Sequence, residues 1–267
     1  GAHNFQTRAL STLVMLPIPI VTVWYGSWVF NLFLTVLGFG LIREWNNLLG
    51  SVLNRRESIT ASILVFCSIG AMWSMSFEVG LGIACIASAV NFLGGWRRGG
   101  LALLLGIGPI YIFLACFSLI WIREIPAHGL YLVTWLLVIV CTTDSFAYLC
   151  GQAIGGRKLA PGISPGKTWS GFVLGVSTAT LLASVLCGDP FNLLYFSENW
   201  QLGTVLGCII AIVSQLGDLA ESWLKRQVNA KDSGNLIPGH GGLFDRVDGF
   251  MAAAPAMWVM ILVFGFN

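Results

Sequence analysis

Charged residues gather in one stretch of a chain that is otherwise strongly apolar. The stretch, residues 222–248, reads SWLKRQVNAKDSGNLIPGHGGLFDRVD and holds four basic residues, three aspartates and a histidine. Cationic side chains bind phosphate groups, carboxylates bind divalent cations, and glycines let the backbone approach a ligand closely. This combination predicts phosphate chemistry at a membrane surface.

Two aspartates and a glycine-rich turn close this stretch. Asp245 and Asp248 are three residues apart, so they share one face if a helix has begun there. Aspartates also cap helix starts, but one would be enough for a cap. The turn before them can adopt backbone conformations closed to other residues, and it comprises Gly239, His240, Gly241 and Gly242.

Two further aspartates, Asp144 and Asp218, lie inside apolar stretches. An ionised carboxylate at mid-bilayer costs on the order of 3 kcal/mol, which makes such a residue a functional candidate. Both lie at similar depth from the same end of their predicted helices, so we expect a shared polar cavity. Together with Asp245 and Asp248 they predict a Mg²⁺ site, because Mg²⁺ takes oxygen ligands. The alternative is that each aspartate is separately hydrogen-bonded and joins two helices.

Helical spacing places polar residues around Asp218 on one stripe. Ser214, Asp218, Ser222 and Lys225 stand at i, i+4, i+8 and i+11. Glu221 is within reach of Lys225 at i+4, so we interpret Glu221 as an ion-pair partner, structural rather than catalytic.

A second glycine-rich loop, residues 155–171, contains Gly-Lys-Thr at 166–168. It is not a nucleotide P-loop, because Pro161 replaces the required first glycine and no strand is expected before it. Backbone N–H groups at a helix start attract anions, so Ser164, Lys167 and Thr168 are predicted to bind substrate. Ordinary positive charge on the cytoplasmic side is the alternative explanation for the loop's basic residues.

The elements that must position these residues are membrane helices. Of the 267 residues, 56% are hydrophobic and 10% are charged, which excludes a soluble globular protein. Nine apolar stretches are each long enough for a helix to cross a bilayer, near 9–25, 27–42, 59–77, 78–94, 100–122, 129–151, 169–188, 202–224 and 249–265. The sequence therefore predicts an all-α, polytopic integral membrane protein with about nine transmembrane helices.

The distribution of Lys and Arg sets the expected orientation. Nine spans put all of them except Arg123 on one side, so that side and the N-terminus are predicted to be cytoplasmic. We divide the chain into structural N-terminal helices (1–99), a middle helix available for a dimer contact (100–128) and a catalytic C-terminal region (129–267). The net charge of +2 does not point to a nucleic-acid partner, and none is expected.

The 222–248 stretch resembles the signature of the phosphatidate cytidylyltransferases, also called CDP-diacylglycerol synthases. That signature runs Ser-x2-Lys-Arg-x4-Lys-Asp-x-Gly-x2-Leu/Ile-Pro-x-His-Gly-Gly-x2-Asp-Arg-x-Asp, and the match is essentially complete. Residues 143–151 and 163–169 are similar to upstream blocks of the family, so the resemblance covers about 140–250. Gly166 replaces a usual lysine and Ser170 a usual glutamate, which leaves Lys167 as the nearer lysine.

The resemblance implies transfer of CMP from CTP to phosphatidic acid, giving CDP-diacylglycerol and pyrophosphate. It implies Mg²⁺, with room for a second, monovalent cation (K⁺), a homodimer, and an active site facing the cytoplasm from the cell inner (plasma) membrane among its lipids. The residues it marks as catalytic are Asp218, Ser222, Lys225, Arg226, Lys231, Asp232, His240, Asp245, Arg246 and Asp248.

For the metal we predict Asp218 and Asp245, with Asp144 and Asp248 next in line. For substrate binding we predict Asp144, Ser164, Lys167, Thr168, Gly239, Gly241 and Gly242. A transporter would favour internal repeats, which are absent from the sequence. A CDP-alcohol transferase would need an Asp-Gly-x2-Ala-Arg pattern, also absent. A cytidylyltransferase for another lipid phosphate, such as an isoprenoid-ether one, stays open.

Overall fold

The computed structural model describes residues 17–49, 53–73, 76–99, 101–187, 200–234, 236 and 241–264. These residues form two compact units. The first unit falls within Gly1–Ile120 and Gln227–Val247, and the second within Trp121–Arg226 and Asp248–Asn267. Each unit therefore combines parts of the chain that are far apart in sequence.

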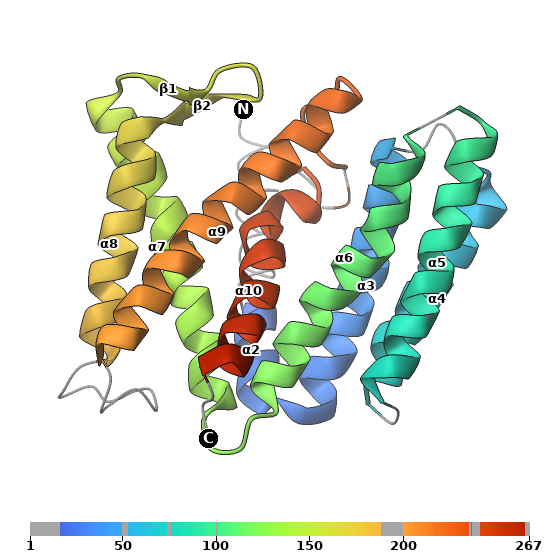
Figure 1. Ribbon diagram of the computed structural model, residues 1–267, viewed down its shortest axis with the longest axis horizontal. Helices are drawn as coiled ribbons and strands as arrows, with labels where there is room; N and C mark the ends of the chain where they lie inside the picture. Colours follow the sequence, from blue (N-terminus) through green and yellow to red (C-terminus); the bar gives the residue numbers. More distant parts are fainter. Residues whose placement is uncertain are drawn as a thin grey trace. The chain divides into compact units, whose positions relative to one another are not determined.

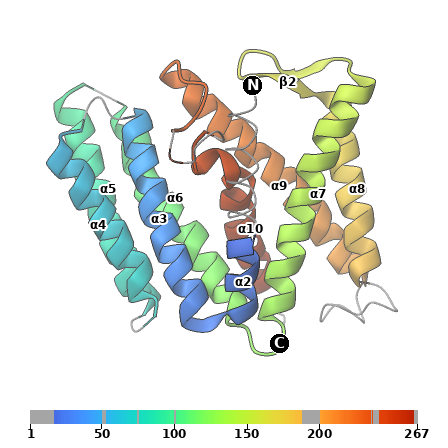
Figure 2. The ribbon, with the colours of Figure 1, turned by 180° about the vertical axis from the view of Figure 1, so that it is seen from behind.

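The first unit is built from helices of the N-terminal half. They are α2 (Pro17–Tyr25), α3 (Ser27–Leu49), α4 (Arg55–Ala71), α5 (Phe77–Arg97) and most of α6 (Ala102–Arg123), joined late in the chain by the 3-10 helix η1 (Phe244–Arg246). Helix α4 packs against both α3 and α5 (Figures 1 and 2). The rings of Phe77, Phe113 and Phe117 form part of the core between α5 and α6, with centroids 4.6 to 6.0 Å apart.

Helix α3 is longer than the sequence predicts. Hydropathy ends the second span at residue 42, and it places Arg43 in a loop, whereas the helix continues to Leu49. The prediction was wrong because the polar residues of the last turns are buried in the unit: Glu44 is 2% exposed and Asn46 is 1% exposed. The indole Nε1 of Trp45 donates to the carbonyl oxygen of Leu104 over 3.0 Å, which ties this end of α3 to α6.

An ion pair joins α4 and α5 at one end of the first unit. The Arg98 guanidinium lies 2.5 Å from the Glu57 carboxylate and keeps the pKa of that carboxyl below its ordinary value. Both side chains are partly exposed, at 32% and 23%, so water and salt screen the pair. Glu57→Gln is therefore a suitable control variant for the experiments below.

The second unit holds the C-terminal helices. It contains α7 (Gly129–Ile154), β1 (Lys158–Ala160), β2 (Ser164–Thr168), α8 (Trp169–Cys187), α9 (Trp200–Gln227) and α10 (Asp248–Phe264). Helices α7 and α8 lie side by side in both ribbon views. Glycine permits this approach, because a Cβ at Gly175 of α8 would lie 2.8 Å from the carbonyl oxygen of Thr143 on α7.

The loop after α7 is an antiparallel β-hairpin, drawn next to the ends of α7 and α8 in Figure 1. The expectation that no strand precedes Gly166 was wrong, because β1 pairs with β2 through Lys158 and Thr168. Gly155 and Gly156 have φ of 64° and 98°, a conformation that lets the chain leave α7 and turn into β1. The hairpin places Lys167 at a fixed position rather than on a free loop.

The described helices are those of a membrane protein. Six of them, α3 and α5–α9, are long and apolar enough to cross a membrane, while α10 is a shorter apolar helix. Large apolar side chains on these helices are exposed, including Leu103 (69%), Leu181 (68%) and Val263 (70%). Such apolar exposure needs lipid around it. The all-α class is confirmed, with one small hairpin added; the count of nine spans and the cytoplasmic N-terminus stay predictions.

Candidate functional site

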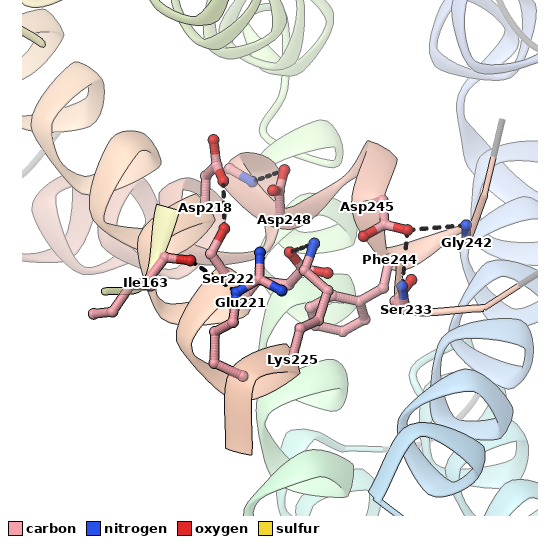
Figure 3. A network of polar contacts seen from close by, with 12 residues as sticks. Ile163, Asp218, Glu221, Ser222, Lys225, Ser233, Gly242, Phe244, Asp245 and Asp248 are labelled. Carbon is pink, nitrogen blue, oxygen red and sulfur yellow. Dashed lines mark hydrogen bonds and ion pairs between the residues drawn. The ribbon is translucent and has the colours of Figure 1, made fainter. Parts of the chain in front are cut away.

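Three carboxylates converge in the second unit. Asp218 and Glu221 lie on α9, and Asp248 is the first residue of α10; their ligand oxygens lie within 4.8 Å of one another. Figure 3 shows Asp218 and Asp248 next to each other, with Glu221 close by. Asp218 and Asp248 were predicted as site residues, whereas Glu221 was interpreted as structural.

Local helix geometry produces this cluster. Asp218 and Glu221 are three residues apart on α9, so both project toward the same neighbouring helix. The start of α10 comes close because Gly217 has no side chain: a Cβ there would lie 2.6 Å from the Ala252 Cβ and 3.0 Å from the Asp248 carbonyl oxygen. Gly217 therefore sets the distance between Asp248 and the two acids of α9.

Gly217→Ala is expected to separate α9 from α10 and to weaken the site. The added methyl group overlaps with Ala252, and overpacking of this kind typically costs about 1–3 kcal/mol. The matched control is Gly82→Ala on α5, where a Cβ meets open space. For Gly217→Ala in detergent we expect a lower melting temperature and a lower rate of the reaction proposed below. Both quantities should stay near the wild-type values for Gly82→Ala. Equal behaviour of the two variants would contradict this account of the helix contact.

Two lysines balance part of the negative charge. Lys167 Nζ on β2 lies 2.7 Å from the Asp218 carboxylate, and Lys225 Nζ lies 2.6 Å from the Glu221 carboxylate. The predicted Glu221–Lys225 ion pair is thus confirmed. Asp144 on α7 is close enough to interact electrostatically with both Asp218 and Lys167. Four acids lie here with two ammonium groups among the described residues, so a bound cation would stabilise the ionised form of the acids.

The donor set fits Mg²⁺. All three converging groups offer carboxylate oxygens, and Mg²⁺ is commonly held by one or two carboxylates together with substrate phosphates and water. The absence of sulfur and imidazole from this group of three argues against a zinc-type site. Asp218, Glu221 and Asp248 would hold such an ion, with Asp144 beside them.

Other predicted residues of the second unit lie on α9 and on the hairpin. The Ser222 hydroxyl makes a long contact of 3.5 Å to Asp218 Oδ1, and Arg226 Nε donates to the Ile163 carbonyl oxygen at the hairpin turn over 3.1 Å. Thr168 is 4% exposed, and its hydroxyl accepts the N–H of Gly171 at the start of α8. Ser164, at the start of β2, is half-buried. Arg226 therefore connects the end of α9 to the hairpin that carries Lys167.

Predicted residues of the first unit lie on the segment Gln227–Val247. Asp245 Oδ2 accepts the backbone N–H groups of Ser233 and Gly242, each over 2.9 Å. Gly241 has φ of 84°, in agreement with the predicted glycine conformation. Three charged residues are exposed to solvent: Lys231, Asp232 and Arg246. Asp245 thus fastens two parts of its own segment together.

Some predictions cannot be compared directly with the structure. Gly239 and His240 lie outside the described residues. The expectation that Asp218 and Asp245 share one ion joins residues of the two units, and it stays a prediction. Asp245 and Asp248 do not share one helix face, because Asp245 belongs to η1 and Asp248 begins α10.

Glu44 is a buried acid that the sequence analysis missed. Its carboxylate accepts hydrogen bonds from Ser233, Leu243 and Phe244, all on the charged segment of the same unit. No local signal in the sequence identifies it, because its hydrogen-bond partners lie 189 to 200 residues later in the chain.

Comparisons with known proteins give matches along most of the chain. The model of the cytidylyltransferase family matches residues 6–264. A phosphatidate cytidylyltransferase of Brucella abortus is 35% identical over 271 residues, 98% of this chain and 94% of that protein. One from Rickettsia felis is 30% identical over 264 residues, with the same coverage. One from Bacillus subtilis is 37% identical over 161 residues, 59% of this chain and 57% of that protein.

Proposed function

Since this chain belongs to the cytidylyltransferase family, we propose that it transfers CMP from CTP to phosphatidic acid, with CDP-diacylglycerol and pyrophosphate as products. The observation that carries the proposal is the cluster of Asp218, Glu221 and Asp248 beside two lysines, on apolar helices. A nucleotide and a lipid phosphate are both polyanions, so their reaction needs a site with cationic groups at a membrane. The names of the relatives point to the same pair of substrates.

The reaction does not need a strong general base. An oxygen of the lipid phosphate, already anionic at neutral pH, forms a bond to the α-phosphorus of CTP. The bond from that phosphorus to the bridging oxygen breaks, and the electron pair leaves with pyrophosphate. Positioning and electrostatic stabilisation therefore supply most of the catalysis.

The acids of the second unit would bind the metal ion of the substrate complex. Asp218, Glu221 and Asp248 would hold Mg²⁺, with Asp144 next to them, and we propose the same negative region for the second, monovalent cation. When bound, Mg²⁺ neutralises charge on the triphosphate and on the departing pyrophosphate. Asp245 stays a predicted ligand in the first unit.

Basic residues would hold the phosphate groups. Lys167 and Lys225 already lie at the carboxylates, and each can exchange this partner for a phosphate oxygen. Arg226, Lys231 and Arg246 are exposed and are proposed to bind the triphosphate and the lipid phosphate. Ser222 would donate a hydrogen bond to a phosphate oxygen, and His240 would orient a phosphate or assist the leaving group.

The location and assembly follow from the same proposal. CTP is a cytoplasmic nucleotide, so the site would face the cytoplasm from the inner membrane, while the lipid tails stay in the bilayer. A homodimer is proposed, with the α6 region, residues 100–128, as its contact.

One assay tests the proposal directly. Purified protein in detergent is incubated with radiolabelled CTP and phosphatidic acid, with and without Mg²⁺, and the lipid fraction is analysed for a CMP group. We expect label in the lipid, equimolar pyrophosphate, and loss of both when the metal is chelated. Label that appears with an isoprenoid-ether lipid phosphate but not with phosphatidic acid would support the second candidate. Absence of nucleotide transfer to both lipids would overturn the proposal.

A further inference from the structure

The carboxylate of Glu44 lies among hydrogen-bond donors from the charged segment Gln227–Val247. The N–H of Leu243 donates to Glu44 Oε1 and the N–H of Phe244 to Oε2, each over 2.8 Å. The hydroxyl of Ser233 lies 3.2 Å from Oε2. Both carboxylate oxygens of Glu44 are thus used, and the side chain is 2% exposed.

Ser233 connects this acid to the second acid of the unit. Its hydroxyl contacts Glu44, while its backbone N–H donates to Asp245 Oδ2, which also accepts the N–H of Gly242. The two acids therefore join residue 233 to residues 242–244, and so they close the segment into a loop. Lys231 and Asp232 lie just before this junction, and Arg246 lies just after it.

Packing around Glu44 leaves little freedom for another arrangement. A Cβ at Gly234 would lie 2.7 Å from Glu44 Oε1, and a Cβ at Gly242 would overlap with the Ser233 hydroxyl. Trp45, the residue after Glu44 on α3, has its ring centroid 5.5 Å from that of Phe244. Gly234 therefore lets the segment approach the Glu44 side chain closely, and Gly242 lets the two ends of the segment approach each other.

Burial of a carboxylate on a helix costs free energy that an apolar side chain of similar size would not cost. Burial of a charge is tolerated when hydrogen bonds replace its hydration, and hydrogen bonds to a charged acceptor are stronger than neutral ones. An apolar residue at position 44 would pack α3 but would leave two backbone N–H groups and a hydroxyl without an acceptor. The hydrogen bonds of the loop, and not the packing of α3, therefore explain why residue 44 is a glutamate.

We propose that Glu44 is a positioning residue for the reaction: it holds the two ends of the loop together, and so it positions Lys231, Asp232 and Arg246, which flank the loop, for the substrate phosphates. This inference rests on the proposed function for the role of those charged residues. Glu44 itself does not touch the substrate; it acts through the backbone of Leu243 and Phe244.

The decisive variant is Glu44→Gln. Whichever way the amide is turned, its NH₂ group faces the N–H of either Leu243 or Phe244, so one hydrogen bond is replaced by two opposed donors. We expect kcat/KM for CTP to fall on the order of 10- to 100-fold, because small misplacements of phosphate-binding groups have effects of this size. Glu44→Asp keeps both oxygens on a shorter chain and should recover part of the loss.

Readouts other than activity measure the loop itself. Hydrogen exchange of the Leu243 and Phe244 amides should become faster by at least about 10-fold in Glu44→Gln, since a hydrogen-bonded amide is protected until it opens. Trypsin cleavage after the exposed Lys231 should become faster as well. The melting temperature in detergent identifies any loss of fold, and kinetics are expressed per folded molecule.

A second variant and a control keep the test decisive. Gly234→Ala pushes a methyl group against Glu44 without changing any charge, and it should give the same exchange and kinetic phenotype even if Glu44→Gln folds poorly. Glu57→Gln removes a carboxylate from the same unit and should change neither readout.

Several outcomes would overturn the inference. Wild-type exchange rates and activity in Glu44→Gln would do so. A loss of activity fully accounted for by the unfolded fraction, with normal CTP kinetics per folded molecule, would assign Glu44 a purely structural role. If the wild-type protein does not transfer CMP, the proposed function fails, while the exchange and cleavage measurements still decide whether Glu44 holds the loop.

Discussion

Asp218→Asn is expected to reduce CMP transfer by roughly 10³-fold, because loss of a metal ligand removes several kcal/mol of charge stabilisation from the transition state. Asparagine has nearly the same shape as aspartate, so the packing of α9 is preserved. The charge of the ion pair with Lys167 is lost, but the amide oxygen of asparagine can still accept a hydrogen bond from the buried Lys167 Nζ. The variant should therefore fold normally and fail in catalysis.

Three measurements separate this expectation from its alternatives. The melting temperature should stay near the wild-type value. The Mg²⁺ concentration needed for half-maximal activity should rise, if residual activity permits its determination. Glu57→Gln, assayed in parallel, should keep full activity. An Asp218→Asn protein with activity within about threefold of wild type, a difference of less than 1 kcal/mol, would remove Asp218 from the metal site.

Glu221→Gln is expected to affect both stability and catalysis. Glu221 and Lys225 form a pair whose side chains are 2% and 12% exposed, and removal of one partner of a buried pair typically costs about 3–5 kcal/mol. The variant also loses one of the three converging carboxylates, so activity should fall on the order of 10²-fold through weaker charge stabilisation.

The double variant Glu221→Gln with Lys225→Met separates the two effects. Without an unpaired ammonium group the free energy of unfolding in detergent should return toward the wild-type value. Lys225 is itself a proposed phosphate ligand, so activity should stay low in the double variant and in Lys225→Met alone. If Glu221→Gln is destabilised but keeps wild-type activity per folded molecule, Glu221 is structural, as the sequence interpretation had it.

Much of the second unit could be predicted from the sequence. Asp144 and Asp218 stand out in the sequence because a carboxylate inside an apolar helix costs free energy. The structure brings both of them close to Asp248. Glu221 received less weight, because an acid four residues from a lysine has an ordinary explanation. The spacing along α9 could not reveal that a second helix begins opposite it, since that contact depends on Gly217 and on residues about thirty positions later.

The first unit was predicted less well. Hydropathy recognises lipid-facing residues, so the window ended before Arg43, although the helix continues through Glu44 to Leu49. Burial of a polar turn by a distant segment has no local signature. The hairpin was missed for a related reason: two strands of only three and five residues, the second containing Pro165 and Gly166, carry too little periodicity to be recognised.

The long-range hydrogen bonds of Glu44 bear on how the chain is synthesised. Its partners lie 189 to 200 residues downstream. Helix α3 therefore enters the membrane before the groups that donate hydrogen bonds to the Glu44 carboxylate have been synthesised. At ordinary translation rates of about 5–20 residues per second, roughly 10–40 s pass before the matching donors emerge from the ribosome. A truncated chain that stops before residue 233 keeps this charge unsatisfied, and it should therefore be recognised by quality-control proteases rather than persist as a stable fragment.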